Sequence, residues 1–159
     1  TKTLDQKREG KSIDETASWV EHHKKNLCHV FTVDDLMYLH RGGRLSKVSA
    51  VLGTVINIKP MLHVDNEGHL ILLGKERGRK KALQSLVGMM DERLGSYRDK
   101  NDVIYISHGD CEEDALYVKD LVQRKYPSVK KIEVNTIGAT IGAHAGPGTL
   151  AMFFMGDQR

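Results

Sequence analysis

A histidine within a run of small residues is the part of this sequence best suited to chemistry. Residues 137–148 read Ile-Gly-Ala-Thr-Ile-Gly-Ala-His-Ala-Gly-Pro-Gly, and His144 is their one ionisable side chain. Glycine permits positive φ, so successive backbone N–H groups could turn toward one point and cradle an anion beside the imidazole. Spacing alone leaves open a second interpretation, a glycine-rich connection in which a neighbouring carbonyl satisfies the histidine. We call residues 137–148 the histidine segment.

Arginines form a second candidate group. Arg44 follows a glycine pair between two expected helices. It could cap carbonyls of the preceding helix or meet a phosphate or carboxylate. Arg77 and Arg79 belong to the basic run Lys75–Lys81, which has five positive charges and one negative charge. This run is either a solvated face or a patch for an anionic ligand or acidic partner. It lacks the interleaved aromatic residues typical of a nucleic-acid surface.

Signatures of enzymes and metal sites are missing from the sequence. It has no Gly-x-Ser-x-Gly, no Walker loop, no His-Glu-x-x-His and no paired-cysteine zinc pattern. Two cysteines, Cys28 and Cys111, are too few for a disulfide scaffold and indicate reduced thiols in the cytoplasm. No apolar run has the length of a membrane span. We therefore expect a cytoplasmic binding protein without catalytic residues, metal or cofactor.

The order of expected elements predicts an α/β fold. The 159 residues, with a net charge of +3, suit one domain with a real core. Apolar alternation and turn residues predict strands at 28–33, 61–64, 70–73, 103–107, 131–136 and 149–155. Capping residues and helical periodicity predict helices at 12–25, at 34–39, after Ser46, after the basic run and after Asp110. These elements predict a two-layer sandwich, in which helices pack on a single mixed β-sheet of about five or six strands.

The sequence gives one more prediction for residues 1–11 and one for the helix after Ser46. Residues 1–11 have the pattern of a helix already in progress. We expect them to be the tail of an upstream helix or linker, and 12–159 to form the domain. The helix after Ser46 has an apolar stripe that is expected to be buried and contains Val48, Val51, Leu52 and Val55.

Five stretches of the chain resemble one protein family in order and spacing. They are residues 34–46, 58–60, 76–82, 106–110 and 141–150, which include His-Arg-Gly-Gly-Arg-Leu-Ser and His-Ala-Gly-Pro-Gly. Together they resemble the DegV family of bacterial fatty-acid-binding proteins. Proteins of that family have two α/β domains, and the similarity covers the C-terminal one. The resemblance therefore implies that the N-terminal domain is absent from this chain.

The resemblance implies binding of a long-chain fatty acid such as palmitate. The carboxylate would be held at the domain boundary, and the acyl tail would lie in an apolar tunnel. His144 matches the family histidine that meets the head group, and we place Gly146, Val51 and Leu52 in the same fatty-acid site. Hydroxyl groups of the other domain would complete the head-group contacts. Ala145 stands where threonine is frequent in the family, which removes one hydroxyl donor.

The resemblance also implies a partner. Some family members present the bound carboxylate to a separate, ATP-using subunit of a fatty acid kinase, and are themselves non-catalytic. Arg44, Arg77 and Arg79 would then face that subunit or the transferred phosphate. The alternative function is a non-enzymatic interaction module that binds an acidic partner or nucleic acid through Lys75–Lys81. Nucleic acid is the weaker alternative, because the run has no stacking residues.

Overall fold

A single mixed sheet organises the molecule. The computed structural model describes residues 2–44 and 57–159. The six strands follow the order β3-β2-β1-β6-β4-β5. Neighbouring β4 and β5 are parallel, and the other four neighbouring pairs are antiparallel. The strands are β1 (Leu27–Thr32), β2 (Ile58–Val64), β3 (Leu70–Arg77), β4 (Val103–His108), β5 (Lys131–Thr136) and β6 (Leu150–Met155). The predicted fold class is confirmed.

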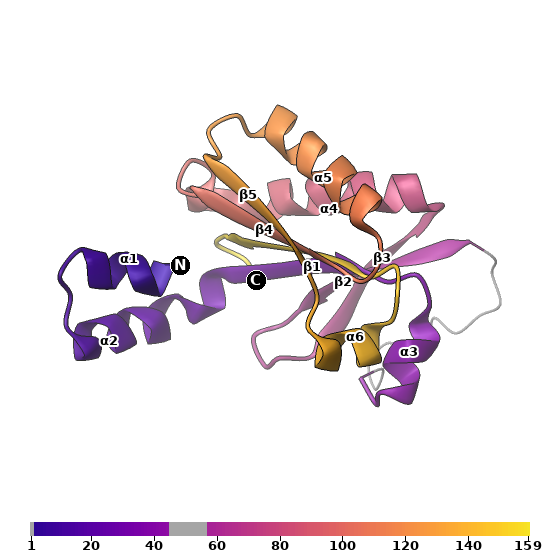
Figure 1. Ribbon diagram of the computed structural model, residues 1–159, viewed down its shortest axis with the longest axis horizontal. Coiled ribbons are helices and arrows are strands. Elements are labelled where there is room, and N and C mark those ends of the chain that lie inside the picture. Colours follow the sequence, from indigo (N-terminus) through magenta and orange to yellow (C-terminus); the bar gives the residue numbers. More distant parts are fainter. Residues whose placement is uncertain (1, 45–56) are drawn as a thin grey trace.

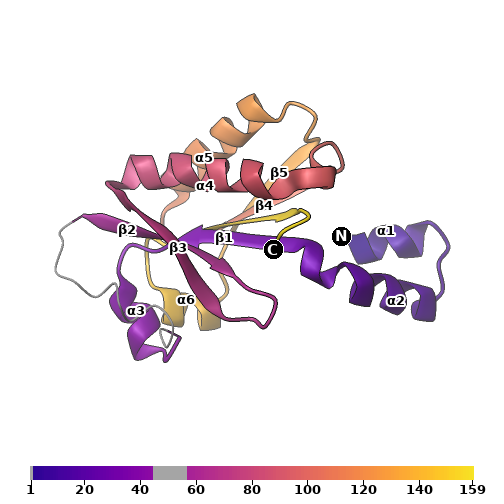
Figure 2. The same cartoon turned by 180° about the vertical axis from the view of Figure 1, so that it is seen from behind.

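Helices lie on both faces of this sheet (Figures 1 and 2). The long helices α4 (Arg79–Leu94) and α5 (Glu112–Lys125) cover one face. The short helices α3 (Leu36–Arg41) and α6 (Ala139–Ala145) pack against each other on the opposite face, at one end of the sheet. An arm made of α1 (Lys2–Arg8) and α2 (Ile13–His23) projects beyond the strands. Two 3-10 turns, η1 (Lys24–Asn26) and η3 (Gly95–Tyr97), complete the described elements.

The main core lies between the sheet and the long helices. Alternate residues of β6 point toward α4 and α5, so Leu150, Met152 and Phe154 are buried while their neighbours are only half-buried. An apolar stripe of α4 with helical spacing meets them, and its members are all buried: Leu83, Leu86, Val87, Met90 and Leu94. Burial of such side chains provides the main stabilisation of the fold, at roughly 25 cal/mol per Å² of apolar surface.

A smaller core lies on the opposite face, beneath α3 and α6. Phe31 and Leu62 follow Val30 and Met61 directly, so their side chains point away from α4. The buried members of this second cluster are Phe31, Val33, Leu39, Leu62 and Ala145, and partly buried residues of β2, β3 and β6 surround them. The histidine segment is therefore anchored on the face opposite to the main core.

The sequence predicts two capping boxes, Ser12 with Glu15 and Asp110 with Glu113, of which only the first forms. The capping box of α2 is confirmed, since the Ser12 hydroxyl accepts from Glu15 N while Glu15 Oε2 accepts from Ser12 N. The second box is wrong. Asp110 lies in a left-handed turn at φ +53°, and Cys111 is the N-cap of α5, although its side chain makes no capping hydrogen bond to the first turn. The acidic first turn of α5, Glu112 onward, still complements the helix dipole.

The cap of α3 and the turn between β2 and β3 can also be compared with the sequence pattern. Asp35, one residue later than expected, caps α3 by accepting from Met37 N at 2.8 Å. The hairpin between β2 and β3 is confirmed, with Gly68 at φ +88°. Asp65 Oδ1 accepts hydrogen bonds from the backbone N–H groups of Glu67 and His69, so the carboxylate stabilises the turn.

Candidate functional site

His144 lies in the last turn of a helix rather than in an open loop. Residues Ala139–Ala145 form α6, so the prediction of an irregular glycine loop over 137–148 is wrong for this part. Only Gly146 and Gly148 of the segment have positive φ, at +80° and +75°. The imidazole is half-buried between α6 and α3. Within the residues that the structure describes, neither ring nitrogen has a hydrogen-bond partner, so no carbonyl satisfies the histidine there.

The backbone N–H groups around His144 do not form the predicted anion cradle. Gly142 N donates to Gly138 O at 2.9 Å, and Gly146 N donates to Gly142 O at 2.8 Å. Gly148 N donates to Gly109 O at 2.7 Å. These donors are therefore used within the protein. The assignment of Gly146 to a fatty-acid site stays a prediction.

Close packing between α3 and the histidine segment fixes the imidazole. At three places a Cβ atom on a glycine would meet the other side too closely. A Cβ on Gly146 would lie 2.5 Å from the Tyr38 ring, and one on Gly148 would lie 2.6 Å from Cβ of Asp34. A Cβ on Gly42 would lie less than 3.0 Å from Nδ1 of His144. We call these three pairs the α3 seam: Gly42 with His144, Tyr38 with Gly146, and Asp34 with Gly148.

A buried threonine reinforces the same turn. Oγ1 of Thr149 lies 2.9 Å from Ala145 O and 2.8 Å from Gly146 O, and it donates to these carbonyls at the end of α6. Thr149 is only 3% exposed. Sequence reasoning missed both Thr149 and Tyr38, although the hydroxyl directly after a Gly-Pro-Gly turn was a signal that could have identified Thr149.

Apolar surface adjoins the histidine. Ala145, the residue after His144, belongs to the second core cluster with Leu39, Phe31 and Leu62. The site thus combines one imidazole with an apolar sheet face. The two residues assigned to the tail site from the sequence, Val51 and Leu52, lie outside the described residues together with the rest of their stripe.

The three candidate arginines have different surroundings. Arg44 is exposed and donates through Nη1 to Gly42 O at 2.7 Å, while its N–H donates to Leu39 O. This is the carbonyl-capping role that the sequence left open. Arg77 is exposed at the end of β3. Arg79 opens α4 and pairs with Asp114, Nε to Oδ2, at 2.7 Å. The structure therefore leaves Arg77 as the more accessible cation of the pair.

Ion pairs also reduce the charge of the basic run. Lys81 pairs with Glu76 at 3.1 Å, and Lys80 lies 5.9 Å from the centre of the Tyr117 ring. With Arg79 held by Asp114, the run offers fewer free cations than its composition indicated. The structure gives no specific support to a nucleic-acid surface at Lys75–Lys81.

A polar hollow adjoins the end of the histidine segment. Its volume is about 430 Å³, and Pro147, Gly148, Lys59 and Arg79 contribute to its lining. Asp34 pairs there with Lys59 at 2.6 Å and with Arg79 at 3.7 Å. Three aspartates (Asp34, Asp110 and Asp114) also line it, so the cations are already balanced.

Cys111 also lines this polar hollow, and His108 accepts a hydrogen bond from its backbone. Burial raises the pKa of the Cys111 thiol, although the nearby Arg79 acts in the opposite direction. The thiol lies 3.3 Å from Thr149 O, to which it donates. His108 is buried at the end of β4, and its Nδ1 accepts from Cys111 N at 3.3 Å, as expected for a turn histidine. Both residues support the turn and do not point to a reaction.

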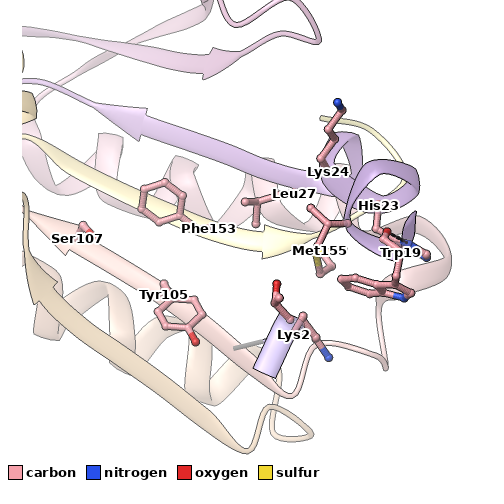
Figure 3. A pocket seen from close by; sticks show the side chains of 11 residues that line it. Lys2, Trp19, His23, Lys24, Leu27, Tyr105, Ser107, Phe153 and Met155 are labelled. Atoms are coloured by element: carbon pink, nitrogen blue, oxygen red, sulfur yellow. Dashed lines mark hydrogen bonds between the residues drawn. The ribbon is translucent and has the colours of Figure 1, made fainter. Parts of the chain in front are cut away.

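A second hollow lies between the arm and the sheet (Figure 3). Its volume is about 620 Å³, and its lining includes Trp19, Leu27, Phe153 and Met155. Tyr105 also contributes, from the face of β4 that points away from the buried Ile104 and Ile106. Because α4 and α5 cover the other face, this hollow shares its sheet face with α3 and α6. That face therefore has apolar surface at both of its ends.

One group of side chains in the described part of the chain has the composition of a metal site. Asp65, Glu67 and His69 bring three candidate ligand atoms within 4.8 Å of one another, but Asp65 already accepts hydrogen bonds from the backbone of the hairpin turn. We assign no metal to it. None of the described helices has the length and hydropathy needed to cross a membrane.

The fold and site define an α/β domain with one mixed sheet and an imidazole held at the edge of an apolar face. Comparison with known proteins agrees with this class. The family model described as "Uncharacterised protein, DegV family" matches residues 2–157. The chain belongs to the DegV family.

Relatives and solved structures show what this chain is similar to. A DegV domain-containing protein of Clostridium perfringens is 47% identical over 153 residues, which are 96% of this chain and 52% of the relative. The crystal structure of DegV, a fatty acid binding protein from Bacillus subtilis, has a TM-score of 0.76 at 32% identity. The superposition covers 98% of this chain and 54% of the Bacillus subtilis protein. A structure described as fatty acid binding of a DegV family protein from Thermus thermophilus has a TM-score of 0.83 at 27% identity, with the same coverage. The chain thus spans about half the length of its relatives.

Proposed function

We propose that this domain binds a long-chain fatty acid such as palmitate, with the carboxylate at His144. The observation that supports this most is the position of the imidazole, half-buried at the edge of an apolar cluster and without an internal hydrogen-bond partner in the described residues. A carboxylate in apolar surroundings needs a donor, and a charge-assisted hydrogen bond supplies one. Relatives described as fatty-acid-binding proteins support the ligand class.

The acyl tail supplies most of the affinity in this proposal. Burial of an alkyl chain is worth about 0.8 kcal/mol per methylene group, so a long tail outweighs a single head-group contact. The tail would lie on the sheet face that carries the second core cluster, with Val51 and Leu52 contributing to the same site. Gly146 would belong to this site through its backbone, because the Tyr38 ring occupies the space where a side chain would lie.

The proposed function includes a partner and a compartment. A separate ATP-using kinase subunit would receive the carboxylate, and the domain itself would be non-catalytic. Among the three arginines, Arg77 suits contact with that subunit best, because Arg44 and Arg79 already hold internal partners. Two free cysteines, Cys28 and Cys111, fit a reducing cytoplasm.

Mass spectrometry of bound ligand tests this function. The complete gene product is purified under native conditions, and its mass is compared before and after removal of lipid by organic extraction. The expected result is one long-chain fatty acid per polypeptide, which extraction removes and added palmitate restores. Absence of any bound acid, together with failure of added palmitate to bind, would reject the function.

A further inference from the structure

The α3 seam has a regular spacing. On α3 and the residue before its cap, the participants Asp34, Tyr38 and Gly42 are four residues apart, which places them on one helical face. Their partners Gly148, Gly146 and His144 are two residues apart and run in the opposite direction. Figures 1 and 2 show the two helices side by side. One face of α3 thus follows the histidine segment from its turn to the imidazole.

Gly42 has to be a glycine because of its contact with His144, and not because of its backbone conformation. Its φ of −74° and ψ of −2° are right-handed values that other residues adopt readily. A Cβ atom there would nevertheless collide with Nδ1 of His144. The adjacent Gly43 is the converse case, since its φ is +69° and a Cβ would meet no atom within 4 Å. The chain therefore contains one glycine that makes room for the ring and a neighbour that serves only the turn.

Tyr38 fixes the other side of the same turn. Its ring lies against Gly146, the C-cap of α6, and leaves no space for a side chain there. Thr149 holds the two carbonyls at this point, so the end of α6 is fixed from both sides. His144 is two residues away from Gly146, and its ring position follows from this turn.

We propose that Tyr38 and Gly42 are positioning residues that make the site selective for an ionised carboxylate over a neutral head group. This inference rests on the proposed function, and it concerns the residues that set the imidazole rather than the imidazole itself. A hydrogen bond weakens steeply as its length and angle depart from the optimum, so a displaced ring loses the carboxylate. The apolar contacts of the tail do not depend on the ring position. Loss of positioning therefore lowers acid affinity and leaves ester affinity nearly unchanged.

Palmitate and methyl palmitate are the probes that separate these effects. Their affinities for the complete gene product are measured by displacement of a fluorescent fatty acid, for wild type, Gly42→Ala, Gly43→Ala, Tyr38→Ala and Tyr38→Phe. In Gly42→Ala and Tyr38→Ala the palmitate affinity is expected to fall about tenfold, the size of one charged hydrogen bond. Methyl palmitate affinity changes less than about twofold in the same variants, because the tail contacts persist. Tyr38→Phe keeps the ring and the wild-type preference.

Gly43→Ala is the control variant, and two different results would overturn two different parts of the proposal. Gly43→Ala strains the same turn without touching His144, so it is expected to affect both probes alike. A wild-type preference for palmitate that Gly42→Ala and Tyr38→Ala both retain would overturn the positioning role alone. A wild-type protein that binds both probes equally would overturn the head-group role of His144, and the positioning role with it.

Discussion

Arg79 joins the first turns of two helices, since its Nε donates to Oδ2 of Asp114 at 2.7 Å. Its side chain is 21% exposed, and its Nη1 is buried without a hydrogen-bond partner in the described residues. Arg77, two residues earlier, is exposed at the end of β3. Two arginines that look equivalent in sequence thus differ in their structural role.

Substitution of the two arginines is expected to separate stability from partner binding. Arg79→Ala should lower the free energy of unfolding by about 1–3 kcal/mol, because it leaves the partly buried carboxylate of Asp114 unpaired. Arg77→Ala should change it by less than about 0.5 kcal/mol and should lower the rate at which a kinase subunit phosphorylates bound palmitate. Urea unfolding and an acyl-phosphate assay measure the two effects, with exposed Lys119→Ala as control. Equal stability of the two variants would contradict this account.

A core substitution tests the packing of α4 on the sheet. Leu86 is 0% exposed in the main core, whereas Leu116 on α5 is 49% exposed. Leu86→Ala is expected to lower the free energy of unfolding by about 2–5 kcal/mol through lost burial and a cavity. Leu116→Ala should cost less than about 0.5 kcal/mol. Urea unfolding of both variants would contradict the structure if the two midpoints shifted equally.

Acid should destabilise the protein partly through His29. Burial, with the nearby Arg159 acting in the same direction, lowers the pKa of His29 from 6.5 to about 4. The unfolded chain therefore binds a proton that the folded chain does not, and stability is lost as pH falls from about 6.5 toward 4. Burial also lowers the pKa of His63, which adds to this loss.

A ring-preserving substitution isolates the contribution of His29. Its imidazole lies edge-on to the Phe153 ring with centroids 5.2 Å apart, so His29→Phe retains aromatic packing. Carboxylates with lowered pKa, such as Asp91, affect wild type and variant alike. The variant is expected to lose less thermal stability than wild type between pH 6.5 and 4. Parallel melting-temperature curves over this range would show that His29 does not carry the effect.

Much of the fold could be predicted because it depends on local pattern. The buried stripe from Leu83 to Leu94 has helical periodicity, and β5 has the predicted bounds Lys131–Thr136. Each of these patterns lies within one element. Period and turn residues therefore identify the elements without knowledge of their neighbours.

The local conformation of the histidine segment could not be predicted in the same way. Gly142 disfavours a helix, yet α6 forms because it packs on α3 and the sheet. The sequence indicated His144 as a candidate site residue and left open whether a neighbouring carbonyl satisfies it. Its neighbours Gly42, Tyr38 and Thr149 come from long-range packing, which residue spacing does not reveal. The error at Asp110 has a similar cause, since a left-handed turn replaced the expected cap.

The most direct test of the head-group role is a palmitate titration of the complete gene product carrying His144→Ala, beside wild type and His22→Ala. His22 is exposed on α2 and lies 2.6 Å from Ser18 O, so it is a matched control outside the site. We expect His144→Ala to bind palmitate about tenfold more weakly at an unchanged melting temperature, while His22→Ala binds as wild type does. Wild-type palmitate affinity in His144→Ala would contradict the head-group role.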